Sequence, residues 1–276
     1  MFAILLALGI GYTLHAKDVF QPPKRPAPSK WSEVVPQRES LEFQTTEGRK
    51  LRGWLYQSDR SDAPFVLFFY GSNQELAHEA KRLAWLRDTL HVNAVCVDCP
   101  GYGFSGGSIG IPTIQSSALQ EFDYVKRRFA PSTTTAIISY GWSIGTSVAM
   151  HVAANRHVAG SMLQAPPANT DDMMRWSSKH DLPWYGRGLL KMKADPHVTQ
   201  VYENAAAIRD VSSPLLIIQA ELDGVVPVDQ GRAALAASRA AQKEYVGVPG
   251  AHHNDLKFAS PPPRALRSTL QNRCDK

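Results

Sequence analysis

One stretch decides the fold of this chain: Ile137-Ile138-Ser139-Tyr140-Gly141-Trp142-Ser143-Ile144-Gly145-Thr146-Ser147-Val148-Ala149-Met150. An apolar run typical of a β-strand ends in Gly-x-Ser-x-Gly and continues as a small-residue helical pattern without a linker. A serine on so sharp a turn lies in strained backbone, and its flanking glycines let neighbouring chains approach closely. We expect the turn to lift the Ser143 hydroxyl out of the sheet, above a helix N-terminus with free N–H groups. Ser143 is therefore a candidate nucleophile, with an ordinary Gly-Ser turn as the alternative.

The length suits one large domain, or one domain with an insertion, and the composition indicates neither disorder nor a polytopic membrane protein. The chain has 276 residues, 43% of them hydrophobic, and a net charge of +5. Its basic residues are scattered, as in Lys126-Arg127-Arg128, which indicates a solvated helix face and no nucleic-acid partner. Cys96 and Cys99 straddle a strand end and do not open a helix, so buried thiols are favoured over a redox or metal site, with Cys274 near the terminus.

The first forty residues do not have the pattern of a folded domain. Residues 2–14 are apolar throughout, but they lack a preceding basic segment and are short for a spanning helix. The basic residues that follow would hold that flank in the cytoplasm. We expect residues 1–16 to be a hydrophobic signal or membrane anchor, which favours membrane association or export over a cytoplasmic location. Residues 17–40 are proline-rich and are predicted to form an extended tether.

Folded sequence begins near Leu41 and alternates between strand and helix patterns. Residues 41–46 and 51–57 alternate in polarity around a glycine turn and predict a hairpin. The chain then alternates, with strands predicted at 64–70, 93–98, 137–142, 158–164, 215–220 and 244–248, and helices at 74–90, 112–129 and 229–241 as well as after Ser143. This order predicts a mostly parallel sheet with an antiparallel start.

Two later loops supply partners for Ser143. A serine nucleophile needs a base to take its proton and an acid to orient that base, both at the carboxyl ends of neighbouring strands. The run at 215–220 leads into a turn that carries Asp223, and the next strand leads into His252 and His253. The alternative role for Asp223 is structural: an aspartate directly before a glycine, here Gly224, is also typical of a residue that caps a turn. Three residues in this order, each directly after a predicted strand, favour the catalytic interpretation.

Further motifs accompany the Gly-Trp-Ser-Ile-Gly turn. They are Asp98-Cys99-Pro100-Gly101-Tyr102-Gly103-Phe104-Ser105, Glu221-Leu222-Asp223-Gly224-Val225-Val226-Pro227 and His253-Asn254-Asp255. In these motifs, and in the order Ser, Asp, His, the sequence resembles the α/β-hydrolase superfamily. It looks most like the abhydrolase-domain serine hydrolases, which are often membrane-tethered. The resemblance covers residues 41–255, nearly all of the foldable chain.

The resemblance implies an α/β-hydrolase fold for residues 41–276, with helices on both sheet faces and a small cap insertion after the sixth strand, at about 166–211. It implies cleavage of a carboxylic ester or thioester through an acyl-enzyme, without a metal or organic cofactor. Ser143, Asp223 and His253 match the family's catalytic positions, and His252 is the other candidate base. The substrate would be a small molecule with an apolar acyl group. The sequence leaves the oligomeric state open.

The chain departs from the family's pattern at two places. After the third strand the family usually has His-Gly, where this chain has Tyr70-Gly71-Ser72-Asn73. The N–H groups of Ser72 and Ile144 can still form an oxyanion hole, and Tyr70 is either a further donor or a packing residue. Past Asp255 the chain becomes proline-rich, so the family's terminal helix must be displaced or short.

Two other functions compete with ester hydrolysis. A peptidase or amidase on the same scaffold is the nearest, because the three catalytic residues do not separate amide from ester cleavage. A non-catalytic relative that binds a ligand with the same fold is the other. The presence of Ser143, Asp223 and His253 together argues against a pure binding module.

Overall fold

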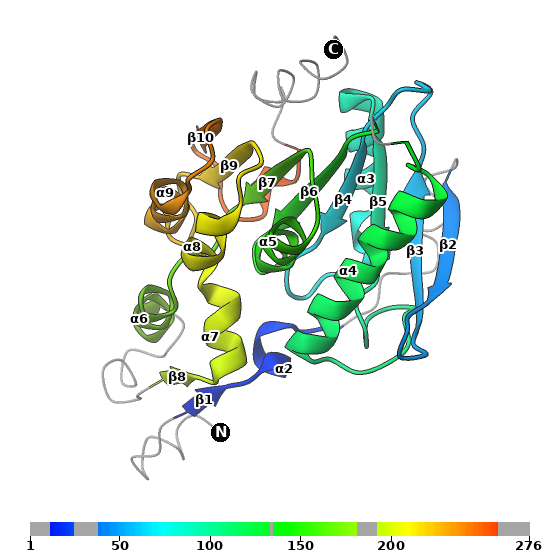
Figure 1. Cartoon of the computed structure of the whole chain (residues 1–276). Helices are drawn as coiled ribbons and strands as arrows, with labels where there is room; N and C mark the ends of the chain where they lie inside the picture. The colour runs from blue at the N-terminus through cyan, green and yellow to red at the C-terminus, as the bar shows by residue number, and fades with distance from the viewer. Residues whose placement is uncertain (1–11, 25–37, 133–134, 181–191, 259–276) are drawn as a thin grey trace.

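The computed structural model describes residues 12–24, 38–132, 135–180 and 192–258. Within these ranges, one eight-stranded sheet forms the centre of the molecule, in the order β10-β9-β7-β6-β4-β5-β3-β2 (Figure 1). Its strands are β2 (Glu39–Gln44), β3 (Lys50–Tyr56), β4 (Phe65–Phe69), β5 (Asn93–Val97), β6 (Ile137–Trp142), β7 (Gly160–Gln164), β9 (Leu215–Ala220) and β10 (Lys243–Val248). β3 is antiparallel to β2 and β5, and every other neighbouring pair is parallel. The predicted sheet with its antiparallel start is confirmed.

The central strands are buried along their whole length. Every residue of β4, β5, β6, β7 and β9 is buried. Continuous apolar runs of this kind are expected where helices cover both faces of a parallel sheet. The burial explains why these strands could be recognised from their sequence, because apolar residues predominate in most of them and form an uninterrupted run in β4.

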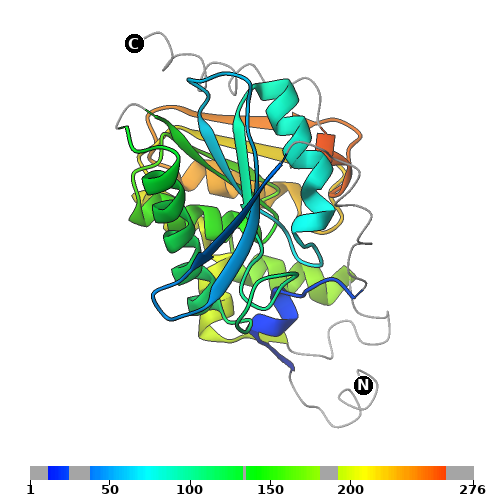
Figure 2. The same cartoon turned by 90° about the vertical axis from the view of Figure 1, so that its right-hand side faces the viewer.

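Helices cover the two faces of the sheet. Figure 2 shows α3 (Ala80–Leu90) on one face and α4 (Ile111–Arg128) with α5 (Gly145–Asn155) on the other. α9 (Val228–Ala237) packs against β9 and β10. The helix predicted at 74–90 begins as the 3₁₀ turn η2 (Leu76–Glu79), which leads directly into α3. The structure therefore has the layers of the predicted fold class.

The segment between β7 and β9 forms the cap. It contains α6 (Thr170–His180), β8 (Met192–Ala194), α7 (Pro196–Tyr202), α8 (Asn204–Ala207) and the 3₁₀ turn η4 (Ile208–Asp210). β8 pairs in parallel with β1 (Tyr12–Leu14) in a separate two-stranded sheet. No strand was expected in this segment. β8 is only three residues long, and its partner β1 lies far away near the start of the sequence. No local alternation of polarity therefore marks β8 as a strand.

The residues that follow β1, which include the first part of the predicted tether, pack against the cap. α2 (Ala16–Val19) lies beside α7, and Val19 and Phe20 are buried in the core (Figure 1). Residues 17–24 are thus folded, where the sequence predicted an extended tether over 17–40, because the two apolar side chains bury themselves against the body. Residues 25–37 lie outside the described part.

The two ends of the chain extend beyond the described residues. The predicted hydrophobic signal or anchor at 1–16 falls mostly in residues 1–11, which lie outside the described residues. It therefore stays a prediction. Among the helices that the structure describes, none has both the length and the apolar character needed to span a bilayer. At the other end, the last described element is the 3₁₀ turn η5 (Asp255–Phe258).

Candidate active site

Ser143 lies on the sharp turn between β6 and α5. Its φ is +54°, in the left-handed region that non-glycine residues rarely adopt. A Cβ atom on Gly141 would come within 2.4 Å of Thr146 Cα, and one on Gly145 within 2.2 Å of the Phe69 carbonyl oxygen. Neither position has room for a side chain, which explains the two glycines of the motif. The close packing of backbone around the turn holds Ser143 in its strained conformation.

Asp223 lies on the turn that follows β9, and its side chain is fully buried. Its Oδ1 accepts hydrogen bonds from the N–H groups of Val225 and Val226, both at 2.8 Å. Its Oδ2 accepts one from Gln219 Nε2 at 3.2 Å and lies 2.8 Å from His253 Nδ1. The carboxylate is therefore held by its own turn and by the strand below, with one oxygen directed at the histidine.

The structure brings His253, and not His252, to Asp223. His253 is buried, whereas His252 is exposed. The His252 ring instead contacts the Leu222 carbonyl oxygen, with its Nδ1 at 3.0 Å. Asp255 Oδ2 accepts a hydrogen bond from the His252 N–H at 2.8 Å, which fixes the turn between the two histidines and η5. His253 begins the turn that follows His252, so the two adjacent rings have different partners.

Trp142 brings the histidine next to the serine turn. The rings of Trp142 and His253 stack with 5.7 Å between their centroids, and Trp142 directly precedes Ser143. Ser143 Oγ makes no hydrogen bond to any residue of the described ranges, His253 included. Such bonds are often long before substrate binds. Of the three residues, the structure thus pairs two directly, and the residue that precedes the third stacks on the histidine of that pair.

The loop after β4 also lies against Ser143. A Cβ atom on Gly71 would lie 3.2 Å from Ser143 Cβ, so the Gly71-Ser72 backbone passes directly beside the serine. Within the described residues, the N–H groups of Ser72 and Ile144 donate no hydrogen bond to a protein group. The Asn73 N–H donates to the Gln21 carbonyl oxygen at 2.7 Å. Two free donors thus remain on the two loops that flank the serine.

Tyr70 has a different set of partners. Its hydroxyl donates to Asp98 Oδ1 at 3.2 Å and accepts from the Cys99 N–H at 2.9 Å. Asp98 also accepts hydrogen bonds from the N–H groups of Leu76 and Phe104. Burial raises the pKa of the Tyr70 hydroxyl, as do the neighbouring Cys99 and Asp98. The hydroxyl therefore donates its single proton to Asp98. This hydrogen bond connects the loop that follows β4 to the loop that follows β5.

The two described cysteines lie in a buried environment. Cys96 lies within β5, and Cys99 follows it. Burial raises the pKa of both thiols, and that of Cys99 reaches about 12. Thiols with such pKa values stay protonated at neutral pH and are poor nucleophiles and metal ligands. Both cysteines are free, and Cys274 lies outside the described residues.

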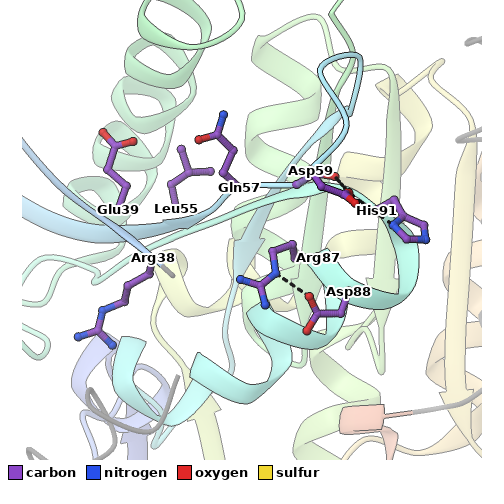
Figure 3. A pocket seen from close by; sticks show the side chains of 9 residues that line it. Arg38, Glu39, Leu55, Gln57, Asp59, Arg87, Asp88 and His91 are labelled. Carbon is purple, nitrogen blue, oxygen red and sulfur yellow. Dashed lines mark hydrogen bonds and ion pairs between the residues drawn. The ribbon is translucent and has the colours of Figure 1, made fainter. Parts of the chain in front are cut away.

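A hollow of about 610 Å³ lies away from these residues (Figure 3). Side chains from β2, β3 and the end of α3 line it, including Arg38, Gln57, Arg87 and His91. It lies at the end of β3 that pairs with the amino-terminal half of β5, whereas Ser143, Asp223 and His253 follow the carboxyl ends of their strands. The hollow contains none of the predicted site residues.

Two glutamines near the site were not predicted from the sequence. Gln219 donates to Asp223, and Gln164 accepts the Ser143 N–H on its main-chain oxygen at 2.8 Å. Both lie near the ends of buried strands, in β9 and β7, among apolar residues. A polar side chain inside such a run must find a partner in the interior. This signal could have pointed to both residues, although not to their partners.

Known proteins resemble the chain in sequence and in fold. No protein-family model matches it. An uncharacterised Mycobacterium tuberculosis protein, Rv2307c, is 28% identical over 86% of this chain and 79% of its own. The lysophosphatidylserine lipase ABHD12 of Gallus gallus is 26% identical over 79% of this chain and 61% of its own. Among solved structures, the Pyrococcus furiosus esterase Pf2001 covers 90% of this chain and 97% of its own, with 16% identity and a TM-score of 0.66, a likeness that concerns the fold.

The sheet order, the turn at Ser143 and these similarities agree on one fold. The predicted relationship is confirmed by relatives in sequence and by the architecture of the solved structures. The chain has the α/β-hydrolase fold, and the proteins that it resembles in sequence include abhydrolase-domain proteins.

Proposed function

We propose that the protein is a serine hydrolase that cleaves carboxylic ester or thioester bonds through an acyl-enzyme, with Ser143, His253 and Asp223 as its catalytic residues. The observation that carries the proposal is the 2.8 Å contact between His253 Nδ1 and Asp223 Oδ2 beside the strained Ser143 turn. Esterases and lipases among the similar proteins support the same reaction class.

The pairing of His253 with Asp223 defines the role of each nitrogen. With Nδ1–H donating to the carboxylate, Nε2 keeps its lone pair and can accept the Ser143 proton as Oγ attacks the acyl carbon. The Ser72 and Ile144 N–H groups would donate to the resulting oxyanion. His253 then gives the proton to the leaving alcohol or thiol. Water, activated by the same imidazole, releases the acid and restores Ser143.

The surface around Asp223 favours an apolar acyl group. Leu222 and Val225 lie close to the aspartate in sequence and are 54% and 53% exposed, and Trp176 of α6 donates from Nε1 to the Gly224 carbonyl oxygen at 3.3 Å. Exposed apolar side chains beside a catalytic loop are suited to contact with a hydrocarbon chain. Because one relative is a lysophosphatidylserine lipase, esters with a single long acyl chain are the first substrates to test.

Active-site labelling and hydrolysis together test the proposal. A fluorophosphonate should label the wild-type protein at Ser143, and p-nitrophenyl esters of graded acyl length should be hydrolysed. Ser143→Ala should abolish labelling and lower kcat by at least about 10³-fold while the protein remains folded. Turnover by Ser143→Ala close to that of the wild type would refute the proposal. Labelling without ester hydrolysis would redirect it to peptide or amide substrates.

A further inference from the structure

A buried ion pair lies beneath the candidate active site, on the face of the sheet covered by α3. Arg82 is 2% exposed, and its Nε lies 2.8 Å from Glu79 Oε2. Arg82 Nη1 donates to Gln164 Oε1 at 2.9 Å and to the Tyr140 hydroxyl at 3.4 Å. Although burial disfavours the charge, Glu79 and Tyr140 raise the pKa of the Arg82 guanidinium. A charged group is therefore held in the interior by an acid and two neutral partners.

Gln164 joins this buried group to both sides of the site. Its main-chain oxygen accepts the Ser143 N–H at 2.8 Å. Its side-chain Nε2 donates to the Leu256 carbonyl oxygen at 2.7 Å, three positions after His253 in the sequence. One residue at the end of β7 therefore contacts the serine turn through its backbone and the histidine loop through its amide.

Arg82 fixes the direction of the Gln164 amide. The oxygen of that amide accepts hydrogen bonds from Arg82 and from the Tyr140 hydroxyl. If the amide were turned over, its NH₂ group would face the Arg82 donor and its oxygen would face the Leu256 carbonyl. Both contacts would then be repulsive, and the buried guanidinium would lose a partner. The amide can therefore donate to the histidine loop in one orientation only.

A second contact runs from Arg82 to the histidine through Trp142. The guanidinium carbon lies 4.5 Å from the centre of the Trp142 ring, and that ring stacks with His253. A planar guanidinium over an aromatic face is a favourable and directional contact. Arg82 thus contacts the imidazole of His253 indirectly, through the Trp142 ring. Gln164 binds the loop that contains His253.

We propose that Gln164 is a positioning residue that sets the separation of Ser143 and His253, and that Arg82 keeps Gln164 in the required orientation. The inference rests on the function proposed above and names residues that do not themselves contact substrate. Loss of the Gln164 amide would let the histidine loop shift relative to Ser143. A displacement of about 1 Å between reacting groups can cost about 100-fold in rate.

The test compares Gln164→Leu with a matched variant on the neighbouring strand. Ser139→Ala in β6 removes a buried hydrogen bond to Ser161 without touching the Arg82 contacts, so it reproduces a loss of stability alone. For each variant, kcat, KM, the rate of fluorophosphonate labelling and Tm are measured. Gln164→Leu should lower kcat and the labelling rate roughly 10- to 100-fold with KM within about twofold, and Ser139→Ala should leave all three rate measures nearly unchanged. Labelling of folded Gln164→Leu at the wild-type rate would overturn the proposal.

Arg82→Lys covers the case in which Gln164→Leu does not fold. Lysine keeps the positive charge near Glu79. It lacks the planar guanidinium group, which contacts Glu79, Gln164 and the Trp142 ring at the same time. It should lower kcat in the same direction, and an unchanged kcat would count against the role of Arg82. A readout independent of turnover is the downfield proton resonance of His253 Nδ1–H, which should shift or broaden in either variant and stay in place in Ser139→Ala. An unlabelled wild-type protein would refute the proposed function, and the resonance would still decide the positioning claim.

Discussion

The Gln21 carbonyl oxygen accepts a hydrogen bond from the Asn73 N–H at 2.7 Å. Asn73 has a φ of +59°, and the Gln21 N–H also reaches Ser72 Oγ, at 3.4 Å. The N-terminal segment therefore holds a left-handed residue directly after Ser72, the proposed oxyanion donor. Strained residues of this kind persist when surrounding contacts fix them. The contact links the start of the chain to the loop beside Ser143.

Removal of residues 1–24 should accordingly lower activity. Without Gln21, the peptide between Ser72 and Asn73 is free to rotate, so kcat should fall roughly tenfold or more. Steady-state kinetics on a soluble ester would measure the change, with a protein lacking only residues 1–11 as the matched control. If the longer truncation fails to fold, Phe20→Ala, which removes a buried anchor of the same segment, should lower kcat in the same direction. Full activity of a folded 1–24 deletion would show that the contact has no catalytic effect.

Replacement of Asp223 by asparagine should keep the fold and lower kcat by about 10⁴-fold. An amide at this position can donate to His253, which favours the tautomer that cannot accept the Ser143 proton. Glu221→Gln is the matched control because Glu221 is an exposed acid two residues away. Kinetics and circular dichroism of both variants decide the matter. Greater damage from Glu221→Gln than from Asp223→Asn would mean that the acid is wrongly assigned.

The adjacent histidines should differ sharply when each is replaced by alanine. His253→Ala removes the partner of Asp223 and should lower kcat by about 10³-fold or more, whereas His252→Ala removes an exposed ring from the Leu222 carbonyl and should cost less than about tenfold. Measurement of kcat and of the labelling rate at Ser143 would separate them. The reverse pattern would transfer the base to His252 and leave Ser143 and Asp223 in place.

Glu121 should make the stability of the protein depend on pH. Burial raises its pKa well above the usual value, and its Oε1 has no hydrogen-bonding partner among the described residues. The carboxyl is neutral when folded but ionises in the unfolded chain above about pH 4.3. Its contribution to stability is therefore complete below that pH and is lost as the pH rises towards the folded pKa.

Glu121→Gln removes this ionisation and keeps the shape of the side chain. The variant should gain in Tm relative to the wild type as the pH is raised from 4 to 8, with the difference smallest at pH 4. Thermal unfolding of both proteins across this range is the measurement. A difference in Tm that does not change with pH would show that Glu121 titrates alike in the folded and unfolded states.

Much of the fold could be predicted because its information is local. β4 is a continuous apolar run, β9 is apolar except for Gln219, and the hairpin of β2 and β3 alternates in polarity around a tight turn. The Ser143 turn could be recognised because two glycines mark places where backbone meets backbone. In each case, residues adjacent in the sequence determine the structure, so no knowledge of distant contacts is needed.

Other features depend on contacts that no local pattern reveals. β8 exists because β1 lies beside it, and α2 lies against α7 with Val19 and the following Phe20 buried. The proline-rich composition of the predicted tether does not reveal the two apolar anchors. The role of Tyr70 depends in the same way on Asp98, which lies on another strand end.

The pairing of β1 with β8 also bears on the order of folding. The two strands are separated by nearly the whole central sheet in the sequence, and contacts between distant segments form late because a long loop must first close. A two-stranded sheet of three residues a side has little stability of its own, so its amides should exchange with solvent well before those of β6. β1, which is synthesised before the central sheet, is thus among the last strands to pair. Anything that retains the N-terminus elsewhere during synthesis would leave the cap unfinished around an otherwise complete sheet.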